Sequence, residues 1–196
     1  MNSQAQVVTN RDVAMDAAMH AILSAVSTGA WPLGMRFIKA LDAFDALLGF
    51  RRSALVHIAP GCTPVLVGHA RDATLESAFA KDVCRVQSIL SRSGENGVIR
   101  SALSAGDDIV LNDVNTDLRY IAGDAHSSSE ACLVVDMPND ASLAFNVECR
   151  HRNAFNTEEV DFLKSLADLF AMALFRDHPD PSDQPAMLTR QYLTLS

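Results

Sequence analysis

The stretch GENGVIRSALSAGDDIVLNDVNTDLRY, residues 94–120, carries the signals that decide the fold. Gly94 and Gly97 frame a turn, because glycine adopts the backbone angles that turns require. The residues that follow predict a short helix over Val98–Ala105, which Gly106 ends. A short helix therefore leads directly into the next, strand-like segment.

Three strands and a long connection follow this helix. Ile109–Val114 (IVLNDV) predicts a strand, and the polar stretch Asn115–Ser129 predicts a long connection with a helical turn at Leu118–Ile121. Ala131–Met137 and Ser142–Cys149 are apolar runs separated by the turn-forming Pro-Asn-Asp. These two runs predict an antiparallel hairpin.

The last helix has the clearest start signal in the chain. Asn156 can cap the helix, and Glu159 lies three residues later, as in a capping box. Phe155, just before the cap, can pack against Val160. After Arg176 the sequence DHPDPSDQP cannot continue a helix, because proline breaks the helical hydrogen-bond ladder.

The N-terminal part predicts two helices, a hairpin and a third helix, from helical apolar spacing and a Pro-Gly turn. In chain order these are helices at Asp12–Thr28 and Met35–Leu48, strands at Ser53–Ile58 and Val65–His69, and a helix at Leu75–Ser91. Strands and helices do not alternate one for one. An α+β antiparallel sheet with helices packed against it fits better than a doubly wound parallel fold.

The composition excludes several classes of protein. A net charge of −8 repels phosphate backbones, so direct nucleic-acid binding is not expected. No apolar run is long enough to cross a bilayer, and the start MNSQAQVVTNRD lacks a secretory signal, which predicts a cytoplasmic protein without membrane contact. The four cysteines, Cys62, Cys84, Cys132 and Cys149, form no CxxC or CxxH pair, so buried free thiols are expected.

Taken together, residues 94–137 and 144–174 resemble a GAF domain. The family pattern is a Gly-x-x-Gly turn, a short helix, an apolar strand ending in Asp-Val, and a polar loop with an Asp-x-x-Tyr element. Its later portion, a strand leading to a helix start, reads AFNVECRHRNAFNTEEVDFLKSLADLFAMAL here. With the upstream elements in the family's order, the resemblance covers residues 33–176.

The resemblance implies an antiparallel sheet with helices on both faces. It also implies a ligand pocket over one face, roofed by Asn115–Glu130. The chain then divides into an N-terminal helical extension at 1–32, a GAF domain at 33–176, and a Pro- and Asp-rich linker and tail at 177–196. The extra N-terminal helix can pack beside the last helix, either within one subunit or across a two-fold homodimer.

The segment IAGDAHSSSE, Ile121 to Glu130, is similar to the IACDAxSxSE segment of free-methionine-sulfoxide reductases within this family. The resemblance places the reductase cysteines at Ile99 and Gly123, and neither residue can attack a sulfoxide. Cys84 and Cys132 lie in apolar contexts that raise a thiol pKa. We therefore predict no catalytic residue, with a divergent thiol-dependent reductase as the alternative.

Other cofactors have weak support. Covalent bilin attachment in related GAF domains uses a Cys-His pair, which this sequence lacks. His57, His69 and His126 are candidate haem ligands, but a lone strand histidine is more often structural. His151 and Glu148 are isolated and are expected on a solvent-facing turn. No cofactor and no metal are predicted.

Ligand binding is predicted from the loop Tyr120–Glu130, whose small residues and hydroxyls can cradle a small anion or a carboxylate. The alternative is an ordinary polar connection. Trp31 can roof the pocket or anchor a helix corner to the core. The predicted ligand contacts are Trp31, Tyr120, Ile121, Ala122, Asp124, His126, Ser128 and Glu130.

The sequence thus predicts a non-catalytic sensor of a small anion or an amino-acid-like molecule. No output domain is recognised in these residues, so we expect the chain either to signal to a separate partner, such as a sensor kinase or a transcription factor, or to be a fragment of such a protein. A third interpretation is a dimerisation module whose pocket has collapsed.

Overall fold

The computed structural model describes residues 2–27, 33–48, 50, 52–71, 86–90, 97–122 and 127–180. The helices are α1 (Asn2–Ser27), α2 (Leu33–Leu48), α4 (Val98–Ala105) and α5 (Thr157–Asp177), with 3-10 turns at Val114–Thr116 and Pro138–Asp140. The strands are β1 (Arg52–Ile58), β2 (Val65–Arg71), β3 (Ile109–Leu111), β4 (Ser129–Asp136) and β5 (Ser142–Cys149). Residues 86–90 are also helical.

The strands form one five-stranded sheet in the order β2-β1-β5-β4-β3, and every neighbouring pair is antiparallel. Both predicted hairpins are present, as β1–β2 and β4–β5. The pairing of β1 with β5 joins them at the centre of the sheet. The predicted α+β class is confirmed.

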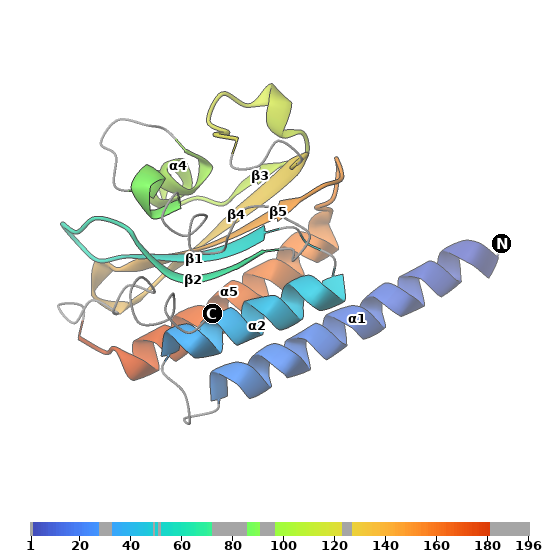
Figure 1. The fold of residues 1–196 in the computed structure, drawn as a ribbon, viewed down its shortest axis with the longest axis horizontal. Helices are drawn as coiled ribbons and strands as arrows, with labels where there is room; N and C mark the ends of the chain where they lie inside the picture. Colours follow the sequence, from blue (N-terminus) through green and yellow to red (C-terminus); the bar gives the residue numbers. More distant parts are fainter. Residues whose placement is uncertain are drawn as a thin grey trace.

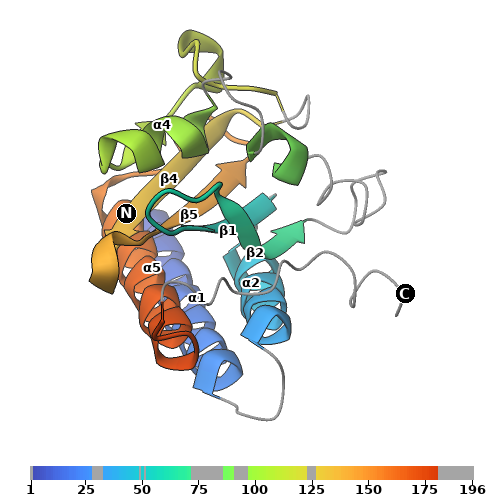
Figure 2. The ribbon, with the colours of Figure 1, turned by 90° about the vertical axis from the view of Figure 1, so that its left-hand side faces the viewer.

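Helices cover both faces of this sheet (Figures 1 and 2). On one face α2 packs on β2 and β1, and α5 packs on β4 and β5. α1 packs on α2 and α5 of the same subunit, and its N-terminal part extends past the rest of the fold (Figure 1). The other face carries α4, which packs on β4 and β5. The two faces therefore have separate apolar cores.

The core under α2 and α5 is built on three phenylalanines. Phe170 of α5 meets Phe37 of α2 and Phe145 of β5 edge to face, with ring centroids 5.4 and 5.5 Å apart. These three are the largest fully buried side chains among the described residues. Gly68 of β2 lies close under this core, because a Cβ there would lie 3.1 Å from Phe37 Cβ, a tight contact.

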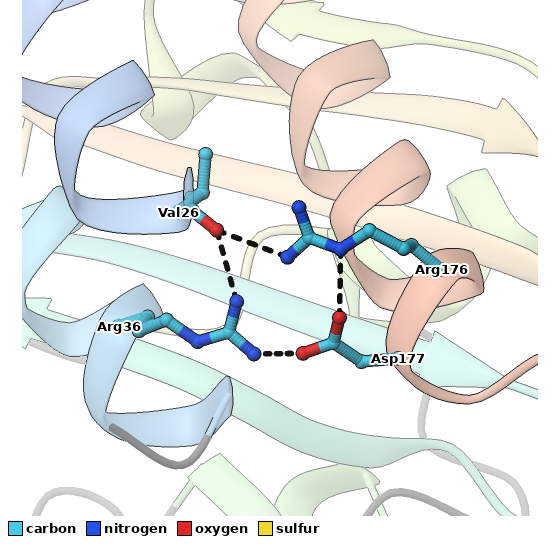
Figure 3. A network of polar contacts seen from close by, with 4 residues as sticks. All are labelled: Val26, Arg36, Arg176 and Asp177. Atoms are coloured by element: carbon cyan, nitrogen blue, oxygen red, sulfur yellow. Dashed lines mark hydrogen bonds and ion pairs between the residues drawn. The ribbon is translucent and has the colours of Figure 1, made fainter. Parts of the chain in front are cut away.

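A polar cluster ties the ends of three helices together (Figure 3). The buried Arg36 guanidinium of α2 donates to the Val26 carbonyl of α1 and pairs with the Asp177 carboxylate at the end of α5. Arg176 donates to the same Val26 carbonyl at 3.1 Å and pairs with Asp177 at 2.8 Å. We call these four residues the helix-end cluster. Burial, and then the positive charge of Arg176, lower the pKa of Arg36.

The capping box of α5 is present as predicted. Asn156 Oδ1 accepts from the Glu159 amide at 3.0 Å, and Glu159 Oε2 accepts from the Asn156 amide at 2.8 Å. Each side chain thus satisfies a backbone donor that the first helical turn leaves open.

Several boundaries differ from the predictions. α1 begins at Asn2 rather than Asp12, and a 3-10 turn at Val114–Thr116 replaces the end of the predicted third strand. β4 begins at Ser129 rather than Ala131, which moves Glu130 from the connection into the sheet. Of the helix predicted at Leu75–Ser91, only 86–90 lie within the described residues.

Candidate functional site

A cavity lies between the sheet and α4. Its volume is about 600 Å³ including the open mouth. It is lined by the sheet residues Arg52, Glu130, Asn146 and Glu148, by Val86, Ile89 and Leu90, by Gly97, Val98, Ile99 and Arg100, and by Ile121. The floor is therefore polar and the walls are largely apolar.

The floor is built on three residues that lie directly opposite one another on neighbouring strands, which we call the rung: Arg52, Glu148 and Glu130. Arg52 of β1 lies directly opposite Glu148 of β5, and Glu148 lies directly opposite Glu130 of β4. Directly opposed residues point to the same face of a sheet, so the three side chains stand side by side under the cavity. Their exposures are only 4%, 5% and 7% for Arg52, Glu130 and Glu148. Charged side chains are seldom buried to this degree in a core without a specific role.

Glu148 is held from two sides. Arg52 Nη1 lies 3.3 Å from both carboxylate oxygens of Glu148, and Ser127 Oγ donates to Oε2 at 2.6 Å. Ser127 belongs to the segment that enters β4, so the connection above the floor is tied to it. These contacts hold the Glu148 carboxyl in place on the floor of the cavity.

Glu130 has a different environment. Its partner is Asn146, two residues along β5 from Glu148 and on the same face, which donates a hydrogen bond to the carboxyl. Burial, reinforced by the negative charge of Glu148, raises the pKa of Glu130 to about 8. At neutral pH this carboxyl therefore keeps its proton. Asn146 Oδ1 is buried and has no hydrogen-bond partner among the described residues.

The walls of the cavity come from α4 and the 86–90 helix. Arg100 of α4 donates to the Leu90 carbonyl at 3.3 Å, which joins the two helices. A Cβ on Gly97 would lie 3.6 Å from Ile121 Cδ1 and 3.9 Å from Ile89 Cγ2. Gly97 thus lines the space between two apolar walls.

The structure places the predicted contact residues in three groups. Ile121 and Glu130 line the cavity. Tyr120 packs beside it against the apolar core under α4, and burial raises the pKa of Tyr120 to about 12. Ala122 is exposed and Ser128 is half-buried, and neither lines the cavity. Trp31, Asp124 and His126 lie outside the described residues.

Sequence reasoning missed Arg52, Asn146 and Glu148. The prediction that Glu148 lies on a solvent-facing turn is wrong, because Glu148 is buried in β5. The signal was available in SLAFNVEC, residues 142–149, where polar residues at 146 and 148 alternate with apolar ones. This alternation puts both on one sheet face, the face of the cavity.

The described cysteines lie outside the cavity. Cys132 is fully buried, and burial raises the pKa of its thiol. Cys149 is buried in the other core, and Cys62 is in the β1–β2 turn. Cys84 lies outside the described residues. Ile99 lines the cavity at the position that the resemblance assigns to a reductase cysteine.

Other chemistries find little support in the described part of the chain. It contains no group of three or more His, Cys, Asp or Glu side chains placed to hold a metal ion. His57 and His69 are buried strand residues, and burial lowers the pKa of His57. Among the described residues, no helix is both long and apolar enough to cross a membrane.

No protein-family model and no curated protein sequence matches the chain. Solved structures do match it. The GAF domain of a phosphoenolpyruvate-protein phosphotransferase from Coxiella burnetii has a TM-score of 0.64 and 14% identity, over 85% of this chain and 96% of that chain. The fold is GAF-like.

Enzymes also share this GAF-like fold. Free methionine-R-sulfoxide reductase from Neisseria meningitidis, in complex with its substrate, has a TM-score of 0.59 and 16% identity, over 78% of this chain and 83% of that chain. A type II free methionine-R-sulfoxide reductase from Thermoplasma acidophilum has a TM-score of 0.54 and 17% identity, over 74% of this chain and 96% of that chain. At such identities the likeness shows the fold alone, so function is argued from the site.

Proposed function

We propose that this GAF-like domain is a non-catalytic sensor that binds a small amino-acid-like molecule in the cavity under α4. The observation that carries the proposal is the buried rung of Arg52, Glu148 and Glu130 on the cavity floor. Burying three ionisable groups costs free energy, so a fold without a ligand to recognise gains nothing from them.

The charge of the floor favours an amino-acid-like ligand over a simple anion. Arg52 is already paired with Glu148, and Glu130 adds a second carboxyl. A nitrate or nitrite ion would meet two carboxyl groups and an arginine already paired with one of them, so it would gain little from this floor. The ammonium group of an amino acid would be attracted to it, since carboxyl oxygens are its natural acceptors.

The rest of the cavity suits the remainder of such a molecule. Arg100 on the wall supplies positive charge for a ligand carboxylate. Val86, Ile89 and Leu90 offer an apolar surface for a side chain such as that of methionine or its sulfoxide. The substrate of the structurally similar Neisseria meningitidis enzyme makes free methionine sulfoxide the first molecule to test.

A divergent reductase is the second candidate, favoured by the structural likeness to two free methionine-R-sulfoxide reductases. The buried Cys132 thiol argues against it, because a thiol with a raised pKa is a poor nucleophile. Cys84→Ser and Cys132→Ser variants should therefore bind the ligand as the wild type does. Turnover of methionine sulfoxide that these substitutions abolish would instead support the reductase.

Signalling in this proposal passes through the helical layer. The division proposed is a helical extension at 1–32, a GAF domain at 33–176 and a tail at 177–196. The helix-end cluster joins α1, α2 and α5 near the point where the tail begins, so a shift of one helix end would move the others. The proposed partners are a second copy of the chain and a sensor kinase or transcription factor.

A thermal-shift screen tests the proposal. The panel contains amino acids, methionine sulfoxide, nitrate, nitrite, cyclic nucleotides and haem, because a bound ligand raises the melting temperature by mass action. We expect the amino-acid class to raise it and the anions to leave it unchanged. A shift with another class alone would overturn the ligand assignment, and no shift at all would favour the dimerisation module.

A further inference from the structure

We infer that ligand binding in this cavity is linked to proton release: the empty site holds a proton on the Glu130–Glu148 pair, and the ammonium group of the ligand takes its place. This inference rests on the proposed function and deepens it. It makes the domain a sensor whose affinity depends on pH as well as on ligand concentration.

The geometry of the rung explains why one carboxyl of the Glu130–Glu148 pair holds a proton. Glu130 and Glu148 are directly opposed on adjacent strands, where Cβ atoms are about 5 Å apart. Two buried carboxylates at such a separation repel each other, so the pair retains a proton unless a cation compensates it. Arg52 compensates one negative charge through its pair with Glu148. The second carboxyl, Glu130, therefore stays protonated.

The hydrogen-bond acceptors on the floor explain why an ammonium group can bind there. Asn146 Oδ1 is buried, lines the cavity side of β5 and has no hydrogen-bond partner among the described residues. Asn146 and Glu148 are two residues apart on one strand face, and Glu130 is opposite Glu148. Three neighbouring side chains with oxygen acceptors thus stand on the same face of the floor. An ammonium group has three N–H donors and is matched to this arrangement.

The charges around Glu130, as far as the described residues supply them, set the sign of the effect. The titratable and charged groups that face it are Glu148 of β5, Arg52 of β1, Asp117 and Tyr120 of the connection before β4, Arg100 of α4 and Cys132 of β4. Burial, and then Glu148, raise the pKa of Glu130, and Arg52 opposes this only in part.

The proton balance is simple. An ammonium ion binds, the Glu130 O–H bond breaks, and the proton passes to the solvent buffer, so the charge of the site is conserved. Binding requires ionised Glu130, whose fraction rises about tenfold for each pH unit below its pKa. The affinity should therefore rise by up to about tenfold per pH unit between roughly pH 6 and pH 8 and level off above that range.

Calorimetric titration with L-methionine sulfoxide, in buffers of different ionisation enthalpy, tests this on the wild-type full chain. We expect about one proton released per ligand near pH 6.5. N-acetyl-L-methionine sulfoxide lacks the ammonium group and should bind at least tenfold more weakly. Glu130→Gln should abolish the proton release and the pH dependence, while Glu158→Gln, an exposed change in α5, should preserve both.

The outcomes separate the two proposals. Binding of L-methionine sulfoxide without proton exchange, or equal binding of its N-acetyl form, would overturn the proton linkage and leave the sensor function standing. Binding of neither L-methionine sulfoxide nor any amino acid of the thermal-shift panel would overturn both. The buffer comparison needs only the wild type, so a Glu130→Gln variant that fails to fold does not weaken it.

Discussion

Glu130 on β4 and Glu148 on β5 lie directly opposite each other, and Arg52 forms an ion pair with Glu148. Glu148 is therefore paired with a cation and accepts a hydrogen bond from the Ser127 hydroxyl, whereas Glu130 accepts a hydrogen bond from the Asn146 side-chain amide. Two groups of one chemical type thus have different neighbours, and burial, reinforced by Glu148, raises the pKa of Glu130 to about 8. This asymmetry lies on the floor of the cavity and underlies the predictions about ligand and pH.

Glu130→Gln should stabilise the ligand-free protein at alkaline pH. The folded-state pKa of about 8 is above the ordinary value of 4.5, so the stability present below 4.5 is lost as pH rises toward 8. Glutamine does not titrate and avoids this loss. Urea unfolding should show the variant more stable than the wild type by roughly 1–3 kcal/mol near pH 8.5 and nearly equal to it near pH 4.5.

The control for this experiment is Glu158→Gln, because Glu158 is exposed in the first turn of α5. Its effect should be within about 0.5 kcal/mol at both pH values. A Glu130→Gln variant that is less stable than the wild type at alkaline pH would contradict the assignment of a proton to Glu130.

Asp177→Asn should destabilise the protein through the helix-end cluster. The substitution leaves the Arg36 guanidinium buried and next to Arg176 without a carboxylate. We expect a loss of about 1–3 kcal/mol in urea unfolding. Asp168→Asn, on an exposed part of α5, is the matched control and should change stability by less than about 0.5 kcal/mol. Equal effects of the two changes would argue against a structural role for the cluster.

Gly97→Ala should reduce ligand binding without unfolding the domain. The added methyl group would lie at ordinary contact distance from Ile121 and Ile89, and the Gly97 φ of −75° suits any residue. The stability should change by less than about 1 kcal/mol. Because the methyl group takes up cavity space, the affinity for the molecule found in the thermal-shift screen should fall severalfold. Unchanged affinity would place the ligand elsewhere.

Asn156→Ala should weaken the start of α5. The change removes the acceptor for the Glu159 amide and breaks the capping box. Such substitutions cost about 1 kcal/mol, measurable by urea unfolding. Asn156→Ser keeps a capping oxygen and should retain most of the stability. If both variants lose the same free energy of unfolding, the capping hydrogen bond contributes little to stability.

Local signals predicted much of the fold. The α5 capping box and the two hairpins depend on residues close together in sequence, and all of them are present. The α4 helix also ends as predicted, because Gly106 takes a φ of 70° that favours glycine. Such features follow from a few neighbouring residues and need no knowledge of the sheet.

The floor of the site depends on contacts that local signals do not contain. Arg52 and Glu148 are separated by 96 positions and meet only because β1 pairs with β5 in one particular register. A shift of one residue would turn Glu148 to the opposite face. Ile121 and Glu130 were predicted from a local resemblance, but Glu130 contacts the cavity from a strand rather than from a roof loop.

The central claim is that the cavity between the sheet and α4 is a ligand site, and chemical-shift mapping tests it most directly. Isotope-labelled protein is titrated with L-methionine sulfoxide, and the perturbed backbone resonances are located. We predict that they cluster at Gly97, Ile121, Glu130 and Glu148. Perturbations confined to the helix-end cluster, or none at saturating ligand, would contradict the account.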